Sequence, residues 1–331
     1  MKKIRKKILC TLLASAALLT AGCGKSNIQD KIYVIGQSQG IQFWDLVQTG
    51  AEDAGYELNC DIVYENAKNT QDIDTQKELI QKAISDKAKA IVFAPNDPSA
   101  LNDELDKAAQ AGIKLIAIDA PTSYKNVTYI GTDNVSAGAI AGRNANNTIL
   151  YGKGQVCIIK HSSSSATAKE RVNGFKNILK DSDVEYVVEE SCNGDADIAR
   201  EQAADAIRKY PELKLIYTTN EKSTIGACEA VAEAGVQGRV RVIGYNANDA
   251  EISYLMDQTL TGTIIQSPYN MGYLGVKYAT DLLQENGTGH AKTIPSNVDT
   301  GATYVNINNY SDDITQLLIH PDTYGQVNSN K

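Results

Sequence analysis

The sequence predicts an α/β protein with two doubly wound lobes, each built on a mostly parallel sheet. Short apolar runs typical of buried strands alternate with longer amphipathic segments typical of helices, and the alternation restarts about halfway along the chain. The chain has 331 residues, which is comfortable for two such units. Its hydrophobic fraction of 42% and charged fraction of 22% are ordinary for a folded protein with a large core.

The N-terminus has the features of a bacterial lipoprotein signal peptide. A basic segment, Met1 to Lys7, precedes an apolar run that is only about half as long as a membrane span requires. The run ends in Leu19-Thr-Ala-Gly-Cys23, where small residues before a cysteine resemble a lipobox. We therefore expect a signal peptide over residues 1–22, a lipid on the Cys23 thiol and a short tether over residues 23–30. Cleavage as an ordinary secretory signal is the alternative.

The first strand–helix series begins at residues 32–35. This strand leads through a polar, glycine-containing turn to Phe43 and Trp44, where a helix begins. Such a turn lies at the carboxyl end of a parallel sheet, where ligands bind. The two rings therefore either stack on a small ligand or anchor the helix in its own core. The other predicted strands are 58–64, 90–94, 114–118 and 127–131, and the predicted helices are 43–55, 70–85, 98–111 and 134–150.

The second series repeats this pattern. Its predicted strands are 155–159, 184–189, 213–218, 240–244 and 263–266, and its predicted helices are 168–179, 198–210, 223–234 and 248–257. A further helix at 270–284, a polar loop at 285–293 and a strand at 300–307 do not extend this series simply. They fit only a chain that crosses between the lobes more than once.

Polar side chains stand where successive strands end. They are Asp119, Asn220, Glu221, Asn246 and Gln266. Arg171 lies in the first turns of the helix after the serine run 162–165. In a parallel sheet these groups converge on one rim, where carboxylate, guanidinium and amides together suit a polyhydroxylated ligand. Taken singly, the Asp and Asn residues are also typical helix caps, and Arg171 could instead pair with Glu170 or with solvent.

Sequence motifs of catalysis and metal binding are absent. There is no G-x-G-x-x-G, P-loop, G-x-S-x-G or H-E-x-x-H motif and no C-x-x-C pair, so we expect no enzyme, cofactor or metal. His161 beside the serine run permits a Ser–His hydrolase, but a polar loop that lines a cleft or caps a helix explains it better. The net charge of −8 argues against a nucleic-acid surface. Cys60, Cys157, Cys192 and Cys228 are expected to be buried free thiols, although export also permits a disulfide.

From about residue 31 to residue 307 the chain resembles the ribose-binding-protein family of periplasmic-binding-protein-like type I folds. The motifs that carry this resemblance follow one another in the family's order. They are Phe43-Trp-Asp-Leu-Val-Gln-Thr-Gly-Ala-Glu52, Ala94-Pro-Asn-Asp-Pro98, Ala111-Gly-Ile-Lys-Leu-Ile-Ala-Ile-Asp119, Ile130-Gly-Thr-Asp-Asn-Val-Ser-Ala-Gly138, Lys169-Glu-Arg-Val-Asn-Gly-Phe175, Thr219-Asn220, Val242-Ile-Gly-Tyr-Asn246, Ile265-Gln-Ser-Pro-Tyr-Asn-Met-Gly272 and Asp299-Thr-Gly301.

The resemblance implies a set of ligand-binding residues. They are Phe43, Trp44, Asp119, Arg171, Asn220, Asn246 and Gln266, with the two aromatic rings on either side of the ligand. Three positions depart from the ribose binders. Ala120 stands in place of an arginine, Ala196 in place of an aromatic residue, and Asn246 in place of an aspartate. These differences argue against ribose itself and leave a neutral sugar, a polyol or a related small polar molecule.

The resemblance also implies a hinge with three crossings, near Thr132, Ser267 and Val298, and a ligand in the cleft between the lobes. The implied N-terminal lobe comprises residues 31–132 and 267–298, and the implied C-terminal lobe comprises residues 133–266 and 299–331.

The implied function is that of a monomeric, lipid-anchored substrate-binding protein on the outer face of a bacterial cell membrane. It would close on a sugar and dock on the permease of an ABC importer. A co-receptor that presents ligand to a membrane sensor kinase or chemoreceptor is the alternative. The ligand-binding half of a LacI-type repressor shares the fold, but the signal peptide and the acidic balance argue against it.

Overall fold

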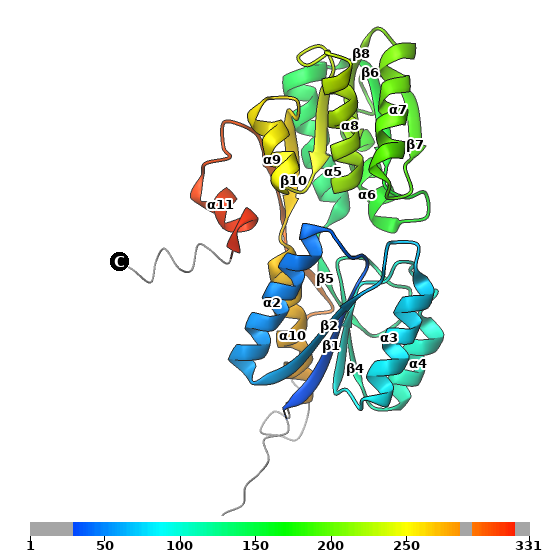
Figure 1. Cartoon of the computed structure of the whole chain (residues 1–331), viewed down its shortest axis with the longest axis vertical. Helices are drawn as coiled ribbons and strands as arrows, with labels where there is room; N and C mark the ends of the chain where they lie inside the picture. The colour runs from blue at the N-terminus through cyan, green and yellow to red at the C-terminus, as the bar shows by residue number, and fades with distance from the viewer. Residues whose placement is uncertain (1–28, 285–292, 322–331) are drawn as a thin grey trace, which may run out of the picture. The chain divides into compact units, whose positions relative to one another are not determined.

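Two six-stranded sheets, each flanked by helices, form the framework of the chain (Figure 1). The computed structural model describes residues 29–284 and 293–321. The predicted signal peptide, the lipidation site Cys23 and nearly all of the predicted loop 285–293 therefore lie outside the described residues. Both sheets belong to one unit, residues 31–331.

The first sheet has the strand order β11-β5-β4-β3-β1-β2. Every pairing from β11 through β5, β4 and β3 to β1 is parallel. Its strands are β1 (Asp30–Gly36), β2 (Cys60–Asn66), β3 (Ala90–Phe93), β4 (Lys114–Ile118), β5 (Thr128–Gly131) and β11 (Asn297–Asp299). The accompanying helices are α2 (Gln42–Leu58), α3 (Ile73–Ser85), α4 (Asn102–Gln110) and α10 (Pro268–Leu283).

The second sheet has the corresponding order β12-β10-β9-β8-β6-β7. Only the pairing of β10 with β12 is antiparallel. Its strands are β6 (Lys153–Lys160), β7 (Asp183–Ser191), β8 (Leu213–Thr218), β9 (Arg241–Tyr245), β10 (Gly262–Gln266) and β12 (Ala302–Val305). The accompanying helices are α5 (Asn134–Ala145), the π-helical turn η1 (Asn146–Leu150), α6 (Ala166–Ile178), α7 (Ala196–Lys209), α8 (Glu221–Glu233), α9 (Asp249–Met256) and α11 (Asp313–Ile319).

Within residues 29–284 and 293–321 the chain changes sheets three times. It passes from β5 to α5 at Thr132, from β10 to α10 at Ser267, and from β11 to β12 at Thr300. Helix α10 then packs against α2, which belongs to the first sheet. The predicted fold class, two α/β lobes with mostly parallel sheets, is therefore confirmed.

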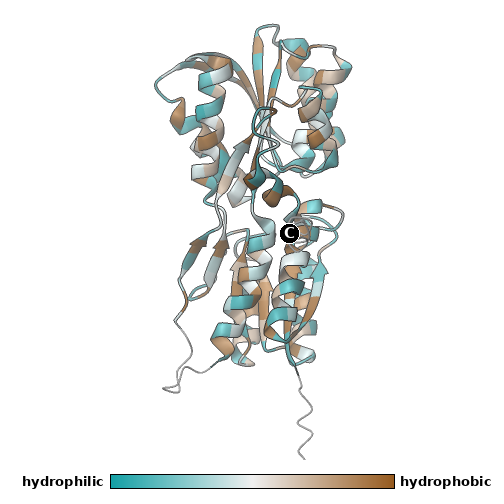
Figure 2. Ribbon diagram, turned by 90° about the vertical axis from the view of Figure 1, so that its left-hand side faces the viewer, coloured by the Kyte–Doolittle hydropathy of each residue, from teal (hydrophilic) through white to brown (hydrophobic). Residues whose placement is uncertain are grey.

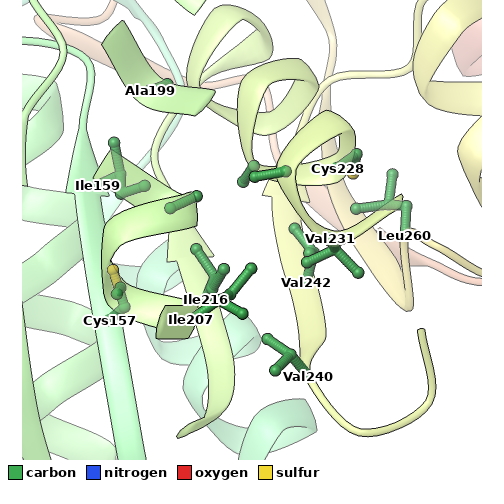
Figure 3. Packing of buried hydrophobic residues seen from close by; sticks show 14 of the residues in the cluster. Cys157, Ile159, Ala199, Ile207, Ile216, Cys228, Val231, Val240, Val242 and Leu260 are labelled. Atoms are coloured by element: carbon green, nitrogen blue, oxygen red, sulfur yellow. The ribbon is translucent and has the colours of Figure 1, made fainter. Parts of the chain in front are cut away.

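Alternate residues of the inner strands enter different cores, which is why these strands are largely apolar, whereas the edge strands β2 and β7 carry exposed acidic residues. In β1, Ile32 and Val34 face α2 and α10, whereas Tyr33 and Ile35 face α3 and α4. The second sheet follows the same rule, and Figure 3 shows one of its two cores, to which Cys157 and Ile159 of β6 and Val231 of α8 all belong. In Figure 2 the strands accordingly carry long apolar segments, whereas the helices alternate between apolar and polar residues.

Several predicted helix boundaries were wrong for local reasons. Helix α2 continues past Gly55, the predicted end, and stops where Asn59 adopts a left-handed φ of 56°. Gly55 is small for a different reason, because a Cβ there would lie 2.3 Å from Ile62 Cγ1. Helix α4 begins at Asn102 rather than 98, since the Asp97 carboxylate accepts the Ser99 and Ala100 backbone N–H groups and forms a turn.

The C-terminal region differs most from the prediction. The expected strand 300–307 shortens to Ala302–Val305, and the helix α11 was not predicted. Cys157, Cys192 and Cys228 are buried free thiols as expected, but Cys60 is only half-buried. No helix among the described residues is both long and apolar enough to cross a membrane.

Candidate functional site

All seven predicted ligand-binding residues line one cavity. It encloses about 470 Å³, part of which is open solvent. The sequence-based prediction did not place six further lining residues in the ligand-binding set: Gln37, Ile41, Thr70, His161, Thr167 and Glu221. The lining residues lie at strand ends and in the first turns of helices of both lobes, where open α/β sheets bind ligands.

Phe43 and Trp44 form the aromatic wall of the cavity at the start of α2. Their rings meet edge to face, with centroids 5.1 Å apart and planes at 76°. Trp44 packs so closely on the end of β1 that a Cβ on Gly36 would lie 2.8 Å from its ring. Both rings belong to the core beneath α2 and both line the cavity. The core anchor that the sequence left open is thus observed, and stacking on a ligand stays a prediction with which the place of both rings in the cavity wall is compatible.

Arg171 ties together groups from several elements of the second lobe. Its Nε donates to Asn134 Oδ1 at 2.8 Å, and its terminal nitrogens donate to Thr219 O at 2.6 Å and Gln266 Oε1 at 2.8 Å. The guanidinium also lies over the Tyr245 ring, 4.3 Å from the centroid. These contacts fix the plane of a buried cation at the cavity, so that its remaining N–H groups are held in place before any ligand arrives. Pairing with Glu170, the alternative from sequence, is not what holds the side chain.

The helices that carry Arg171 and Asn134 approach each other through two glycines. A Cβ on Gly138 of α5 would lie 2.0 Å from Arg171 O, and a Cβ on Gly174 of α6 would lie 2.0 Å from Val135 O. No side chain fits at either contact. The small residues of the two helices therefore allow the close packing that places Arg171 beside Asn134.

Asp119 and Asn246 occupy corresponding positions in the two lobes. Asp119 follows β4 and has a φ of 59°, and Asn246 follows β9 and has a φ of 76°. The backbone N–H of Asp119 donates to Ile130 O of β5, and that of Asn246 donates to Ile264 O of β10, both at 2.9 Å. Left-handed backbone is unusual for residues other than glycine and is best tolerated by Asp and Asn. Such conformations often occur at functional sites, where they aim a side chain off the end of a strand.

The carboxyl group of Asp119 is buried in the cavity wall. Burial raises its pKa to about 6, and the opposing charge of Arg171 limits the rise. No hydrogen bond from another described residue reaches this carboxyl group. It is therefore an acceptor that a ligand hydroxyl can satisfy.

His161 is part of a chain of hydroxyl groups rather than a free base. One ring nitrogen lies 2.8 Å from Thr219 Oγ1 and the other lies 3.0 Å from Ser165 Oγ. Ser165 also caps α6 by accepting the Ala168 backbone N–H. Burial, helped by the charge of Arg171, lowers the pKa of His161 to about 3, so the ring is neutral near pH 7. The favoured interpretation of the serine loop, a polar wall that also caps a helix, describes this arrangement.

Asn220 combines helix capping with a place in the cavity wall. Its Oδ1 accepts the Ser223 backbone N–H at 3.0 Å and the Ser223 hydroxyl at 2.8 Å. The carbonyl oxygen is thereby occupied, and the side-chain NH₂ is the group left to donate into the cavity. Gln266, held by Arg171, donates in turn to Asn246 Oδ1 at 3.2 Å. Neither Ala120 nor Ala196, two of the positions that depart from the ribose binders, lines the cavity.

Residues 32–288 match the family model described as the periplasmic binding protein domain. The chain belongs to this family. Families of this kind consist of solute-binding proteins rather than enzymes, and their members act outside the cytoplasm.

Individual relatives of this periplasmic binding protein are diverse in their ligands. The D-ribose/D-allose-binding protein of Pseudomonas aeruginosa is 25% identical over 300 residues, covering 88% of this chain and 94% of that protein. The fructose import binding protein of Bifidobacterium longum is 27% identical over 290 residues, covering 81% and 86% of the two chains. A solved carbohydrate transporter solute-binding protein from Agrobacterium radiobacter, in complex with D-arabinose, is 27% identical with a TM-score of 0.82, covering 88% of this chain and 99% of that one.

Proposed function

We propose that this chain is a lipid-anchored binding protein that captures a sugar, or a related small polyhydroxylated molecule, for an ABC importer. The observation that carries the proposal is that the seven residues predicted from sequence all line one cavity. The sugar-binding names of its relatives support the same ligand class.

The groups in the cavity match the surface of a sugar. Phe43 and Trp44 offer aromatic area to the C–H face of a ring. Asp119 accepts from hydroxyl groups, Arg171 donates to them, and the amides of Asn220 and Gln266 complete the set. Hydrogen bonds to the charged groups are strengthened when water is excluded, because the effective dielectric falls.

Binding is expected to couple to movement at the three places where the chain changes sheets. The cavity takes residues from both lobes, so a ligand there favours the arrangement in which both walls touch it. We propose that the lobes hinge at Thr132, Ser267 and Thr300, which implies lobe boundaries close to those expected from sequence. The lipid at Cys23 would hold the protein beside its permease.

Calorimetric titration of residues 24–331 with D-ribose, D-allose, D-fructose and D-arabinose tests the proposal. Saturable binding of at least one sugar is expected, and Arg171→Ala should abolish or strongly weaken it. Arg208→Ala is the matched control, because Arg208 is an exposed guanidinium on α7 that pairs with Asp205 outside the cavity. Absence of binding by any of the four sugars in the wild-type protein would count against the proposal, as would equal loss in both variants.

A further inference from the structure

Glu221 is a second carboxyl group in the cavity wall. It occupies the first turn of α8, next to Asn220, and only 4% of the residue is exposed. It lines the cavity described above and also an adjoining cavity of about 330 Å³, which shares Phe43, Asn246 and Gln266 with the first. Glu221 is therefore part of the wall of both spaces.

One oxygen of this carboxyl group has no partner among the described residues. The Asn248 side chain supplies a hydrogen bond to Glu221, but Glu221 Oε2 is buried and accepts none. A buried carboxyl oxygen left without a donor costs the folded protein free energy. Water or a ligand in the cavity can provide the missing donor, and a sugar carries several.

The surroundings of Glu221 favour a donor rather than another acceptor. Burial and the neighbouring Glu221 raise the pKa of Glu251 of α9 well above its usual value, which favours its neutral form. The charges that act on Glu221 are therefore the negative charge of Asp45 of α2 and the positive charge of Lys222. Among the residues that the structure describes, Arg171 is the only cationic side chain that lines the main cavity, and three of its N–H groups already bond protein oxygens. An acidic corner of this kind attracts hydroxyl or amino hydrogens.

We propose that Glu221 contacts the ligand directly and selects sugars that present a hydroxyl or amino donor at this wall of the cavity. The inference rests on the proposed sugar-binding function and assigns to it a second carboxyl contact besides Asp119. Each lobe would then supply one carboxyl acceptor for donor groups of the ligand, since Asp119 follows β4 of the first sheet and Glu221 begins α8 of the second.

The test measures the dissociation constants of wild type, Glu221→Gln and Glu251→Gln for whichever of D-ribose, D-allose, D-fructose and D-arabinose binds wild type most tightly. Glutamine keeps the size of the side chain and removes its second acceptor oxygen. Glu251→Gln is the matched control, because Glu251 is equally buried and adjacent but lines neither cavity. Its cap on the Asn248 backbone N–H is one that glutamine can also make.

Glu221→Gln should weaken binding at least tenfold, and Glu251→Gln should change it less than threefold. The monodeoxy analogues of the same sugar then locate the contact. For one analogue, the wild-type dissociation constant should be about tenfold higher than for the parent sugar. In Glu221→Gln the dissociation constants of this analogue and of the parent sugar should be equal, since the missing hydroxyl and the missing acceptor belong to one hydrogen bond.

Some results would overturn this inference and leave the proposed function intact. One is wild-type affinity in Glu221→Gln, and another is a series of deoxy analogues whose losses of affinity are the same in wild type and Glu221→Gln. Equal weakening of binding by Glu251→Gln would also overturn it, because Glu221 and Glu251 would then affect binding through the local structure around the start of α8 and not through direct contact with the ligand. Failure of wild type to bind any of the four sugars would instead overturn the proposed function and this inference with it.

Discussion

Replacing Asp119 by asparagine should stabilise the ligand-free protein at neutral pH while weakening its binding of sugar. Burial raises the pKa of Asp119 from 3.8 to about 6. Because one pKa unit corresponds to about 1.4 kcal/mol, keeping this carboxylate ionised costs the folded protein about 3 kcal/mol at pH 7. Asparagine carries no charge and tolerates the left-handed φ of 59° at this position. The exchange therefore removes the cost without adding backbone strain.

The difference in the free energy of unfolding between Asp119→Asn and wild type should grow as the pH rises. Between pH 3.8 and about 6 the folded protein retains a proton on Asp119 that the unfolded chain has lost. The stabilisation from this proton is complete below pH 3.8 and disappears as the pH rises through 6. The free energy of unfolding of Asp119→Asn should therefore equal that of wild type near pH 4 and exceed it by about 3 kcal/mol near pH 8.

Urea unfolding of both proteins at pH 4, 5, 6, 7 and 8 measures this difference. Subtracting the two curves cancels the titration of every other group. A difference that stays within about 0.5 kcal/mol across the range would refute the argument that Asp119 is buried without a hydrogen-bond donor. Sugar affinity provides the second half of the test, because Asp119→Asn replaces a charged acceptor and should bind at least tenfold more weakly at pH 7.

The remaining predictions concern the other parts of the account. A ligand hydroxyl bound to Asp119 favours its ionised form, so wild-type sugar affinity measured by calorimetry should rise between pH 5 and 7. The rise should be smaller in Asp119→Asn, where Glu221 is the remaining cavity carboxyl group whose pKa burial raises. Arg171→Ala should weaken binding by at least about 2 kcal/mol, since it leaves buried acceptors unpaired, and wild-type affinity would remove Arg171 from the site. Gly174→Ala should lower the free energy of unfolding by roughly 1–3 kcal/mol, because the added Cβ meets Val135 O, and an unchanged urea midpoint would contradict the close helix contact. Cys23→Ala should release the protein from the membrane fraction, and retention there would contradict lipid anchoring.

The sequence was most informative where a local pattern and the tertiary structure agree. The inner strands could be predicted because they are buried on both faces and therefore largely apolar, as β1 and β3 are. Asp119 and Asn246 could be predicted because each directly follows such a strand. The limits of α2 could not, because Gly55 looks like a stop signal but is small in order to admit Ile62.

The parts of the site that were missed depend on contacts between distant segments. Glu221 was expected on the converging rim but was left out of the ligand-binding set. Followed by Lys222 it resembles any exposed first turn of a helix, and only the packing of Asn248 beside it shows that the acid is buried. Gln37 and Thr70 lie in loops whose spacing carries no signal. Helix α11 has seven residues, too few for a periodic pattern to be distinguished from a loop.

Tryptophan fluorescence during sugar titration tests the central claim most directly. Trp44 is the only tryptophan of the chain and lies in the wall of the cavity. A sugar that binds there should produce a saturable change in its emission with the same dissociation constant as calorimetry gives, and Arg171→Ala should abolish both signals. Saturable binding by calorimetry with no change in Trp44 emission would contradict the assigned cavity, and no binding of any sugar would contradict the assigned function.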